Sequence, residues 1–384
     1  MLLLLILLCV VTVVDGQMKP QCLCKDVGPC MEIQTQIVDE QSPDTLKLLN
    51  DSIPIIVGWT AFFSRPTVAE YLRPTFRDCP FRCQLVDRHE LESPEEVASA
   101  IVFHARNLDT TNLPNRTEDF SQLYVFYVLE APGHRNGHVL SQLPEDFVFN
   151  RTMTYNLDSD YASPYFQLSP IDSSTRAEEV WSDKQIEEVL AKKTQSILAI
   201  ISNCHTLSKR ESLIPHLSKR VKIALRGFCY DKMRITDEET LRLEESHRFY
   251  LALENTACED YVTEKAFRLM KLMIPIVFSR KLVRTVLPAD AFIALDDFAS
   301  IDEFASHIRN VERNSTLYRS YFKWTKRYKK VAGPNAGLCK LCEELHSSNI
   351  EHRTLSSKQL IGADKCIDGF AEKIWGNIVA IQGG

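Results

Sequence analysis

Short apolar runs that alternate with helical stretches constrain the fold of this chain more than any other feature of its sequence. Five such runs follow an amphipathic helix expected over residues 183–193, and they cover residues 196–201, 221–225, 249–252, 274–278 and 291–294. Helical patterns separate several of these runs. This βαβ repetition predicts a parallel sheet with helices on both faces.

The first half of the chain shows a less regular version of the same pattern. Candidate strands cover residues 53–57, 100–103, 124–129 and 153–155. A chain of 384 residues, of which 45% are hydrophobic, also exceeds what a single core usually organises. We therefore expect an α/β fold with two Rossmann-like domains, over residues 51–180 and 181–330, followed by a Cys-rich tail over residues 331–384.

The N-terminus is expected to address the chain to the secretory pathway. Residues 1–14 are almost entirely apolar, and the run ends at Asp15 and Gly16. The run is shorter than the roughly 20 residues that a spanning helix needs. Val14 and Gly16 supply small residues at positions −3 and −1 of a possible cleavage site. Residues 1–16 are thus expected to be a signal peptide or a short signal anchor, with both left open, and residues 17–50 to be a polar stem.

Cysteine usage and glycosylation signals agree with a lumenal location. Twelve cysteines in a chain of this length indicate disulfides formed in an oxidising compartment. Four Asn-x-Ser/Thr sequons occur, at Asn50, Asn115, Asn150 and Asn314. The formal net charge of −6 is spread along the chain, so no basic surface suits a nucleic-acid backbone as a partner.

The most informative stretch lies between residues 249 and 298. An apolar strand ends at Leu253, a polar loop follows, and a helix is expected to begin near Glu259. Such a helix at the carboxyl edge of a parallel sheet would direct N–H groups and its positive end at a diphosphate. Tyr261, Glu264 and Lys265 would share one face of it, although an ordinary ion-paired surface helix has the same spacing.

Three motifs of this stretch resemble the donor-binding signature of the α1,3/α1,4-fucosyltransferases. They are ENTACEDYVTEKAF at 254–267, PIVFSR at 275–280 and LPADAFIALDDFAS at 287–300. The resemblance implies that Asn255, Tyr261, Glu264 and Lys265 contact GDP-fucose. SNCHTLSKR at 202–210 resembles a further element of the family and makes Arg210 a diphosphate ligand, a role that suits the guanidinium because its fork grips two phosphate oxygens.

The first half of the chain carries two more family-like segments. FYVLEAPGH at 126–134 and MTYNLDSDYASPY at 153–165 resemble elements of the N-terminal domain, and Glu130 becomes the implied general base. Ala131, Asn156 and Leu157 depart from the usual pattern there. The resemblance spans about residues 50–350 and implies a GT-B type architecture, in which two Rossmann-like domains face each other across a cleft.

The resemblance also implies an activity. L-fucose would pass from GDP-fucose, with inversion, to the 3-hydroxyl of GlcNAc in a glycoprotein or glycolipid glycan. The acceptor unit (antennary LacNAc or LacdiNAc, or the N-glycan core) and the α1,3 or α1,4 linkage stay open. The enzyme would work in the Golgi lumen as a type II membrane protein, or be secreted if the leader is cleaved. A catalytically inactive glycan- or nucleotide-sugar-binding protein of the same fold is the alternative.

Disulfide pairing follows in part from the family. Its members tie a C-terminal C-x-x-C pair, here Cys339 and Cys342, to two cysteines of the N-terminal domain, which match Cys79 and Cys83 and would fold the tail back on that domain. A bridge between Cys204 and Cys229 is expected in the donor domain. Without Cys9, which leaves with a cleaved leader, five cysteines have no assignment: Cys22, Cys24, Cys30, Cys258 and Cys366. This odd number predicts a free thiol or an intermolecular disulfide.

Two features suggest other chemistry, and we favour plainer interpretations for both. Asp158-Ser-Asp160 has the D-x-D form of a metal site, but it lies far along the chain from the donor signature. No metal or cofactor is therefore expected to be required, and stimulation by Mn²⁺ or Mg²⁺ stays open. The basic octamer at 323–330 is expected to be a solvated helix on which Trp324 and Tyr328 pack together, rather than a phosphate site.

Overall fold

The computed structural model describes residues 10–14, 17–21, 53–76, 79–115, 122–132, 139–145, 147–333, 337–347, 349–351 and 353–376. Strands β1 (Val10–Val14) and β2 (Gln17–Gln21) form an antiparallel hairpin in a separate unit of residues 1–52. The rest of the predicted leader and stem, with Asn50 and the cysteines at 22, 24 and 30, lies outside the described residues. No helix in the described ranges has the length and apolar character needed to cross a membrane.

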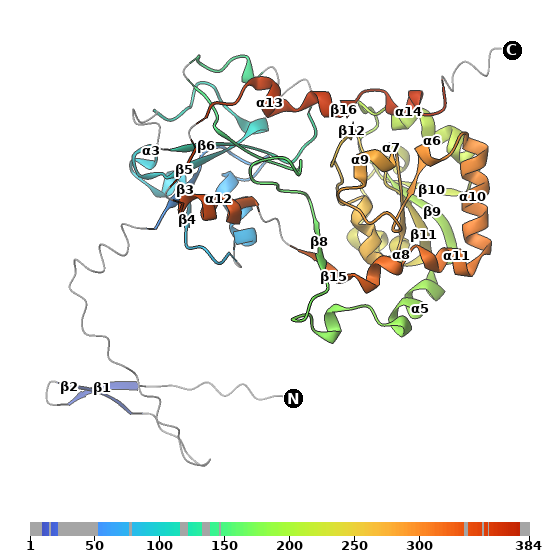
Figure 1. Cartoon of the computed structure of the whole chain (residues 1–384), viewed down its shortest axis with the longest axis horizontal. Coiled ribbons are helices and arrows are strands. Elements are labelled where there is room, and N and C mark those ends of the chain that lie inside the picture. The colour runs from blue at the N-terminus through green and yellow to red at the C-terminus, as the bar shows by residue number, and fades with distance from the viewer. Residues whose placement is uncertain are drawn as a thin grey trace. The chain divides into compact units, whose positions relative to one another are not determined.

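Two five-stranded parallel sheets organise the rest of the chain (Figure 1). The strands of the first sheet are β3 (Ile55–Gly58), β4 (Gln84–Asp87), β5 (Ala100–His104), β6 (Leu123–Val128) and β7 (Arg151–Thr154). Those of the second sheet are β9 (Gln195–Ile200), β10 (Ile223–Arg226), β11 (His247–Leu251), β13 (Ile274–Val277) and β14 (Ile293–Ala294). The orders β4-β3-β5-β6-β7 and β10-β9-β11-β13-β14 are the same doubly wound order, so the prediction of two Rossmann-like folds is confirmed.

Helices cover the sheets, and the strands that they cover are apolar because both of their faces are buried. Every residue of β5 and β6 is buried, as expected for strands with both faces covered. The helices are α2 (Val68–Leu72), α3 (Pro94–Val97), α5 (Asp183–Lys192), α6 (Arg210–Ser218), α7 (Phe228–Asp231), α8 (Asp237–Ser246), α9 (Arg280–Val283), α10 (Ile301–Arg313), α11 (Ser315–Ser320), α12 (Gly337–Leu345), α13 (Ser357–Ile361) and α14 (Phe370–Lys373). In α10 the side chain of Ser300 caps the N-terminus, and Phe304, Ile308 and Val311 form its buried stripe.

Shorter elements complete the structure. The 3₁₀ helices cover Arg73–Phe76, Arg88–Glu90, Ala105–Asn107, Ala177–Glu179, Ala266–Lys271, Leu295–Asp297, Lys323–Lys326 and Ala363–Lys365. Two antiparallel strand pairs join segments far apart in the sequence. They are β8 (Gln167–Pro170) with β15 (Tyr328–Gly333), and β12 (Ala257–Cys258) with β16 (Cys366–Ile367).

The prediction of a solvated helix at 323–330 is wrong. A short 3₁₀ turn ends at Lys326, and Tyr328 then begins β15, where it lies opposite Pro170 of β8. The side chain of Trp324 is only 1% exposed and packs in the core of the second sheet. Burial of this large ring, together with strand pairing, outweighs the local helical pattern.

One predicted glycosylation site is also wrong. Asn150 is 2% exposed, its Oδ1 accepts a hydrogen bond from the Tyr124 backbone, and its Nδ2 donates to the Gln122 carbonyl at 3.1 Å. A glycan would have to be attached to this same buried nitrogen. Asn115 and Asn314 are exposed and keep their predicted status.

The C-terminal tail contacts both sheets. Disulfides join Cys339 of α12 to Cys79, and Cys342 of the same helix to Cys83. Leu360 of α13 packs in a core of the first sheet, whereas β16 pairs with β12 and α14 lies on α6 (Figure 1). The tail therefore packs back on the first domain, as the resemblance implied, but it continues onto the second.

Candidate active site

The carboxyl ends of β9 and β11 form the topological switch point of the second sheet, where doubly wound folds bind their ligands. Residues 201–209 follow β9 and are called the β9 loop here; residues 252–265 follow β11 and are called the β11 loop. Ser208 links the two loops, because its N–H donates to the Asn255 carbonyl at 2.9 Å and its hydroxyl to the Glu254 carbonyl at 2.7 Å.

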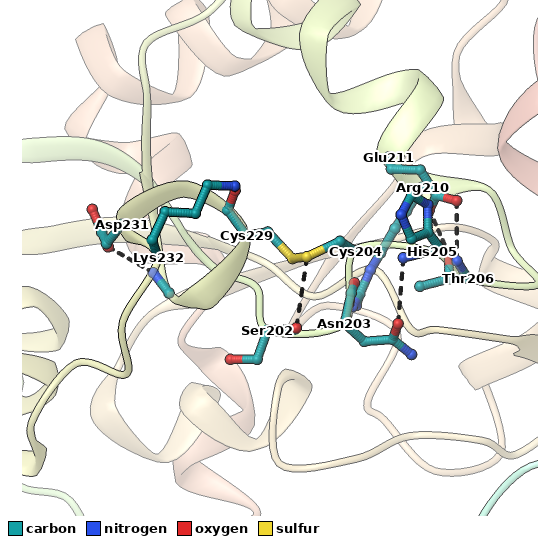
Figure 2. The surroundings of a disulfide bond; sticks show 11 residues. Ser202, Asn203, Cys204, His205, Thr206, Arg210, Glu211, Cys229, Asp231 and Lys232 are labelled. Atoms are coloured by element: carbon teal, nitrogen blue, oxygen red, sulfur yellow. Dashed lines mark hydrogen bonds between the residues drawn. A yellow bond between two sulfur atoms is a disulfide. The ribbon is translucent and has the colours of Figure 1, made fainter.

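Arg210 is a buried cation at this switch point. It is the first residue of α6 and lies beside the Cys204–Cys229 disulfide, which closes the β9 loop onto α7 (Figure 2). Only 3% of Arg210 is exposed. Its Nη1 donates to the Leu253 carbonyl at 2.6 Å and its Nη2 to the Asn203 carbonyl at 3.2 Å, whereas Nε has no partner among the described residues.

The charge of Arg210 is poorly compensated. In the described part of the chain, no carboxylate forms an ion pair or a hydrogen bond with its guanidinium. Burial lowers the pKa of Arg210 below its ordinary value, and the nearby Glu254 carboxylate counteracts this only in part. An arginine stays protonated in proteins, so the site holds a desolvated positive charge, which an anionic ligand would stabilise.

Asn255 provides a second unsatisfied polar group on the adjoining loop. Its Oδ1 is buried and finds no hydrogen-bond partner in the described residues. Asn255 lies in the β11 loop, whereas Arg210 directly follows the β9 loop at the start of α6. Both residues stand at the carboxyl edge of the second sheet, where Arg210 donates to the Leu253 carbonyl and Ser208 to the Asn255 carbonyl.

Lys265 belongs to a network centred on Glu254. Its Nζ lies 2.8 Å from Glu254 Oε2 and 2.8 Å from Thr263 Oγ1, and 3.3 Å from the exposed Glu264 carboxylate. The other Glu254 oxygen accepts both the backbone N–H and the hydroxyl of Thr263. Burial alone would lower the Lys265 pKa, but the carboxylates of Glu254 and Glu264 raise it above its ordinary value, so this ammonium also remains charged.

The helix predicted from Glu259 does not form. The backbone N–H of Glu259 donates to the Lys365 carbonyl, that of Asp260 donates to the Leu282 carbonyl, and Asp260 has a φ of 61°. The next helical turn is the 3₁₀ segment that starts at Ala266. Pairing with the distant C-terminal tail overrides the local pattern, so Tyr261, Glu264 and Lys265 do not share a helical face. The helix that begins at this edge is α6, at Arg210.

Three tyrosines connect the donor side to Glu130. The ring of Tyr261 lies 4.8 Å from that of Tyr155 and 6.1 Å from that of Tyr165, centroid to centroid. The hydroxyl of Tyr165 donates to Glu130 Oε1 at 3.4 Å. Burial raises the pKa of Tyr165 far above its ordinary value, with a further contribution from the Glu130 charge, so this hydroxyl remains a donor.

Glu130 lines a cavity of about 460 Å³ beyond these tyrosines. Tyr155 and Asn156 form part of its wall, and Gln359 and Lys365 of the tail form another part. The second oxygen of Glu130 lies 3.5 Å from Arg106 Nη1. A polar cavity of this size can hold a sugar. The carboxylate beside it can accept a proton from one of the sugar's hydroxyls.

The D-x-D carboxylates line the same cavity but are already paired. Asp158 forms an ion pair with Lys365, and Asp160 forms one with Arg353 and accepts two hydrogen bonds from Thr152. Both acids thus hold the C-terminal tail. Cys83, Cys342 and His346 lie close enough to resemble a metal site, but both sulfurs belong to one disulfide.

Two family models match the chain. The one described as "Fucosyltransferase, N-terminal" matches residues 51–166, and the one described as "Glycosyltransferase family 10 (fucosyltransferase) C-term" matches residues 190–360. The chain is 31% identical to α-(1,3)-fucosyltransferase fut-5 of Caenorhabditis elegans over 312 residues, which cover 76% of this chain and 78% of the relative. The chain belongs to glycosyltransferase family 10, the fucosyltransferases.

Other relatives and a solved structure agree. Identity to α-(1,3)-fucosyltransferase C of Drosophila melanogaster is 31% over 322 residues, which cover 78% of this chain and 75% of the relative. Identity to the Homo sapiens 4-galactosyl-N-acetylglucosaminide 3-α-L-fucosyltransferase FUT6 is 29%, covering 80% and 83%. A crystal structure of an α1,3-fucosyltransferase with GDP-fucose has the same fold, with a TM-score of 0.51 at 14% identity, over 78% of this chain and 93% of that one. The expected fold is confirmed.

Sequence reasoning missed two residues of this fucosyltransferase site. Glu254 positions Thr263 and Lys265, and Tyr165 links Tyr261 to Glu130. Both residues stand at the ends of segments that resemble the family, 254–267 and 153–165. Their presence in the motifs was the available signal, but their contacts depend on the tertiary structure.

Proposed function

We propose that this fucosyltransferase transfers L-fucose from GDP-fucose to the 3-hydroxyl of a GlcNAc residue in a glycoprotein or glycolipid glycan, with inversion. The observation that carries the proposal is the buried, poorly compensated guanidinium of Arg210 at the switch point, where Asn255 Oδ1 is also buried without a partner among the described residues. A planar guanidinium suits the two phosphates of GDP because it can donate to two oxygens at once. Family membership and the names of the relatives support the sugar and the linkage.

In the proposed reaction Glu130 is the general base. The acceptor hydroxyl, bound in the cavity beside Glu130, transfers its proton to the carboxylate while its oxygen attacks the anomeric carbon of fucose. The bond from that carbon to the phosphate oxygen breaks on the opposite side, and GDP leaves with the electron pair. Arg210 and Lys265 stabilise the negative charge that develops on GDP, while Asn255, Tyr261 and Glu264 hold the donor.

The cations of the donor side make a bound metal unnecessary in this proposal. Arg210 and Lys265 both remain protonated, and both D-x-D carboxylates are engaged in ion pairs. Fucose transfer should therefore persist in the presence of a metal chelator, and any stimulation of transfer by Mn²⁺ or Mg²⁺ should be modest.

We further propose that the enzyme works in the Golgi lumen. Four disulfides join described residues of the chain, as expected in an oxidising compartment. The enzyme is either anchored as a type II membrane protein or released after leader cleavage, and cell fractionation tests which of the two applies. Non-reducing electrophoresis tests for an intermolecular disulfide through the stem.

The test is incubation of the purified protein with GDP-fucose and defined glycans that present LacNAc, LacdiNAc or the N-glycan core. Mass spectrometry should detect one added deoxyhexose, and GDP release should depend on the acceptor. An inactive binding protein of the same fold would bind GDP without such release. Transfer from another sugar nucleotide, with none from GDP-fucose, would refute the proposal.

A further inference from the structure

The last described part of the chain continues beyond the range that the family model matches. That match ends at residue 360, whereas the structure describes the chain to residue 376. Residues 362–376, called the C-terminal strap here, include β16 and α14 (Figure 1). The strap therefore lies beyond the matched range.

The strap is bonded to the middle of the β11 loop. Cys366 forms a disulfide with Cys258, and β16 pairs with β12 so that Ile367 lies opposite Ala257. The N–H of Glu259 donates to the Lys365 carbonyl at 3.0 Å. Cys258 stands three positions after Asn255 and three before Tyr261, so the covalent bond falls between two proposed donor contacts.

The strap also holds the β9 loop. The N–H of Gly369 donates to the Leu207 carbonyl at 2.8 Å, and that of Ala371 donates to the Ser208 carbonyl at 2.9 Å. Ser208 itself donates to both Glu254 and Asn255. One short segment thus bonds both loops that converge on Arg210.

Three further side-chain contacts hold the strap. Lys365 forms an ion pair with Asp158 at the cavity that holds Glu130. At the other end, the Trp375 Nε1 donates to the Phe298 carbonyl at 2.9 Å, and the ring of Phe370 lies 5.2 Å from that of Phe278. The strap is thus anchored on both sides of the two loops that it bonds.

We infer that the strap is a positioning element of the donor site, with Cys366 and the N–H groups of Gly369 and Ala371 as its positioning groups. This inference rests on the proposed binding of GDP-fucose. Asn255 lies in the β11 loop and Arg210 directly follows the β9 loop at the start of α6, so the bonds from the strap to both loops order this site before the donor arrives. A site organised in advance binds its ligand more tightly, because less ordering remains to be done upon binding.

The test compares two disulfide variants. Cys258→Ser/Cys366→Ser releases the strap, whereas Cys79→Ser/Cys339→Ser removes a tail disulfide that does not touch the donor loops. For the first variant we expect the GDP-fucose KM and the GDP Kd to rise about tenfold, with the acceptor KM and kcat changed less than about twofold. The second variant should lose thermal stability and keep both donor constants.

A milder variant guards against misfolding of the first. Gly369 has a φ of 63°, in the left-handed region, so Gly369→Ala strains the turn that donates to Leu207 while the disulfide stays intact. We expect about a threefold increase in the GDP Kd, measured by calorimetry without acceptor. Unchanged GDP affinity in both strap variants, or equal losses toward donor and acceptor, would overturn the inference. Failure of the wild type to use GDP-fucose would instead overturn the proposed function.

Discussion

Replacement of Lys265 by Met should weaken both the fold and donor binding, and the two effects can be separated. Nζ of Lys265 lies 2.8 Å from Glu254 Oε2, and the two side chains are 18% and 9% exposed. Breaking a buried ion pair from one side costs about 3–5 kcal/mol, because the remaining charge is left uncompensated. Thr263 still donates two hydrogen bonds to Glu254, and Lys265 is partly hydrated, so we expect a loss of about 2–3 kcal/mol in the free energy of unfolding.

The effect on donor binding has a different origin. A hydrogen bond to a charged group contributes about 1.5–3 kcal/mol, which corresponds to about a 10- to 150-fold increase in the GDP Kd when the ammonium is lost. The double variant Lys265→Met/Glu254→Gln removes both charges and keeps an acceptor for Thr263. Its unfolding free energy should return to within about 1 kcal/mol of the wild type, while its GDP affinity stays low.

Denaturant unfolding and calorimetric titration with GDP measure the two quantities on the same samples. Lys271→Met is the matched control, because Lys271 is an exposed lysine in the 3₁₀ segment that follows Lys265, and its replacement should change neither quantity. A folded double variant that binds GDP as tightly as the wild type would refute the role of Lys265 in donor binding.

Three further predictions follow from the site and its surroundings. Glu130→Gln should lower kcat by about 10²–10⁴-fold with little change in the GDP Kd, and transfer at the wild-type rate would exclude Glu130 as the base. Arg210→Lys should raise the GDP Kd at least about tenfold, because an ammonium cannot donate in a fork; calorimetry measures it, and an unchanged Kd would contradict the assignment. Burial lowers the pKa of His104 from 6.5 to about 4, so the unfolded chain takes up a proton first as the pH falls. The contribution of His104 to the free energy of unfolding is present in full above pH 6.5 and should decline by about 2 kcal/mol at pH 5. Urea unfolding of His104→Gln should show a smaller decline.

The ranges of strands that are covered on both faces were predictable from the sequence. β5, β6 and β9 differ from their expected ranges by no more than one residue at each end, because strands covered on both faces form continuous apolar runs. β4 was missed, since its residues 84–87 include one buried side chain and show no such run. The antiparallel pair of β8 and β15 depends on a partner more than 150 positions away, which local patterns cannot reveal.

On the donor side, too, local sequence does not reveal the features that depend on distant contacts. Arg210 follows Lys209 in a polar segment and would be judged exposed by its neighbours alone, yet it is buried between two loops. The helix expected from Glu259 is absent because the Cys258–Cys366 disulfide and the pairing of β12 with β16 determine the backbone there. The family resemblance identified the residues of the signature, whereas their geometry depends on contacts across the whole chain.

The two disulfides of α12 have a consequence for how the chain matures. Cys79 and Cys83 bond to partners 260 and 259 positions later in the sequence. In the proposed lumenal location, both thiols emerge during synthesis long before the cysteines that they need. For that interval they must be kept from oxidising with each other or with other early cysteines, so correct maturation requires either chaperone protection or the later rearrangement of wrong disulfides by an isomerase.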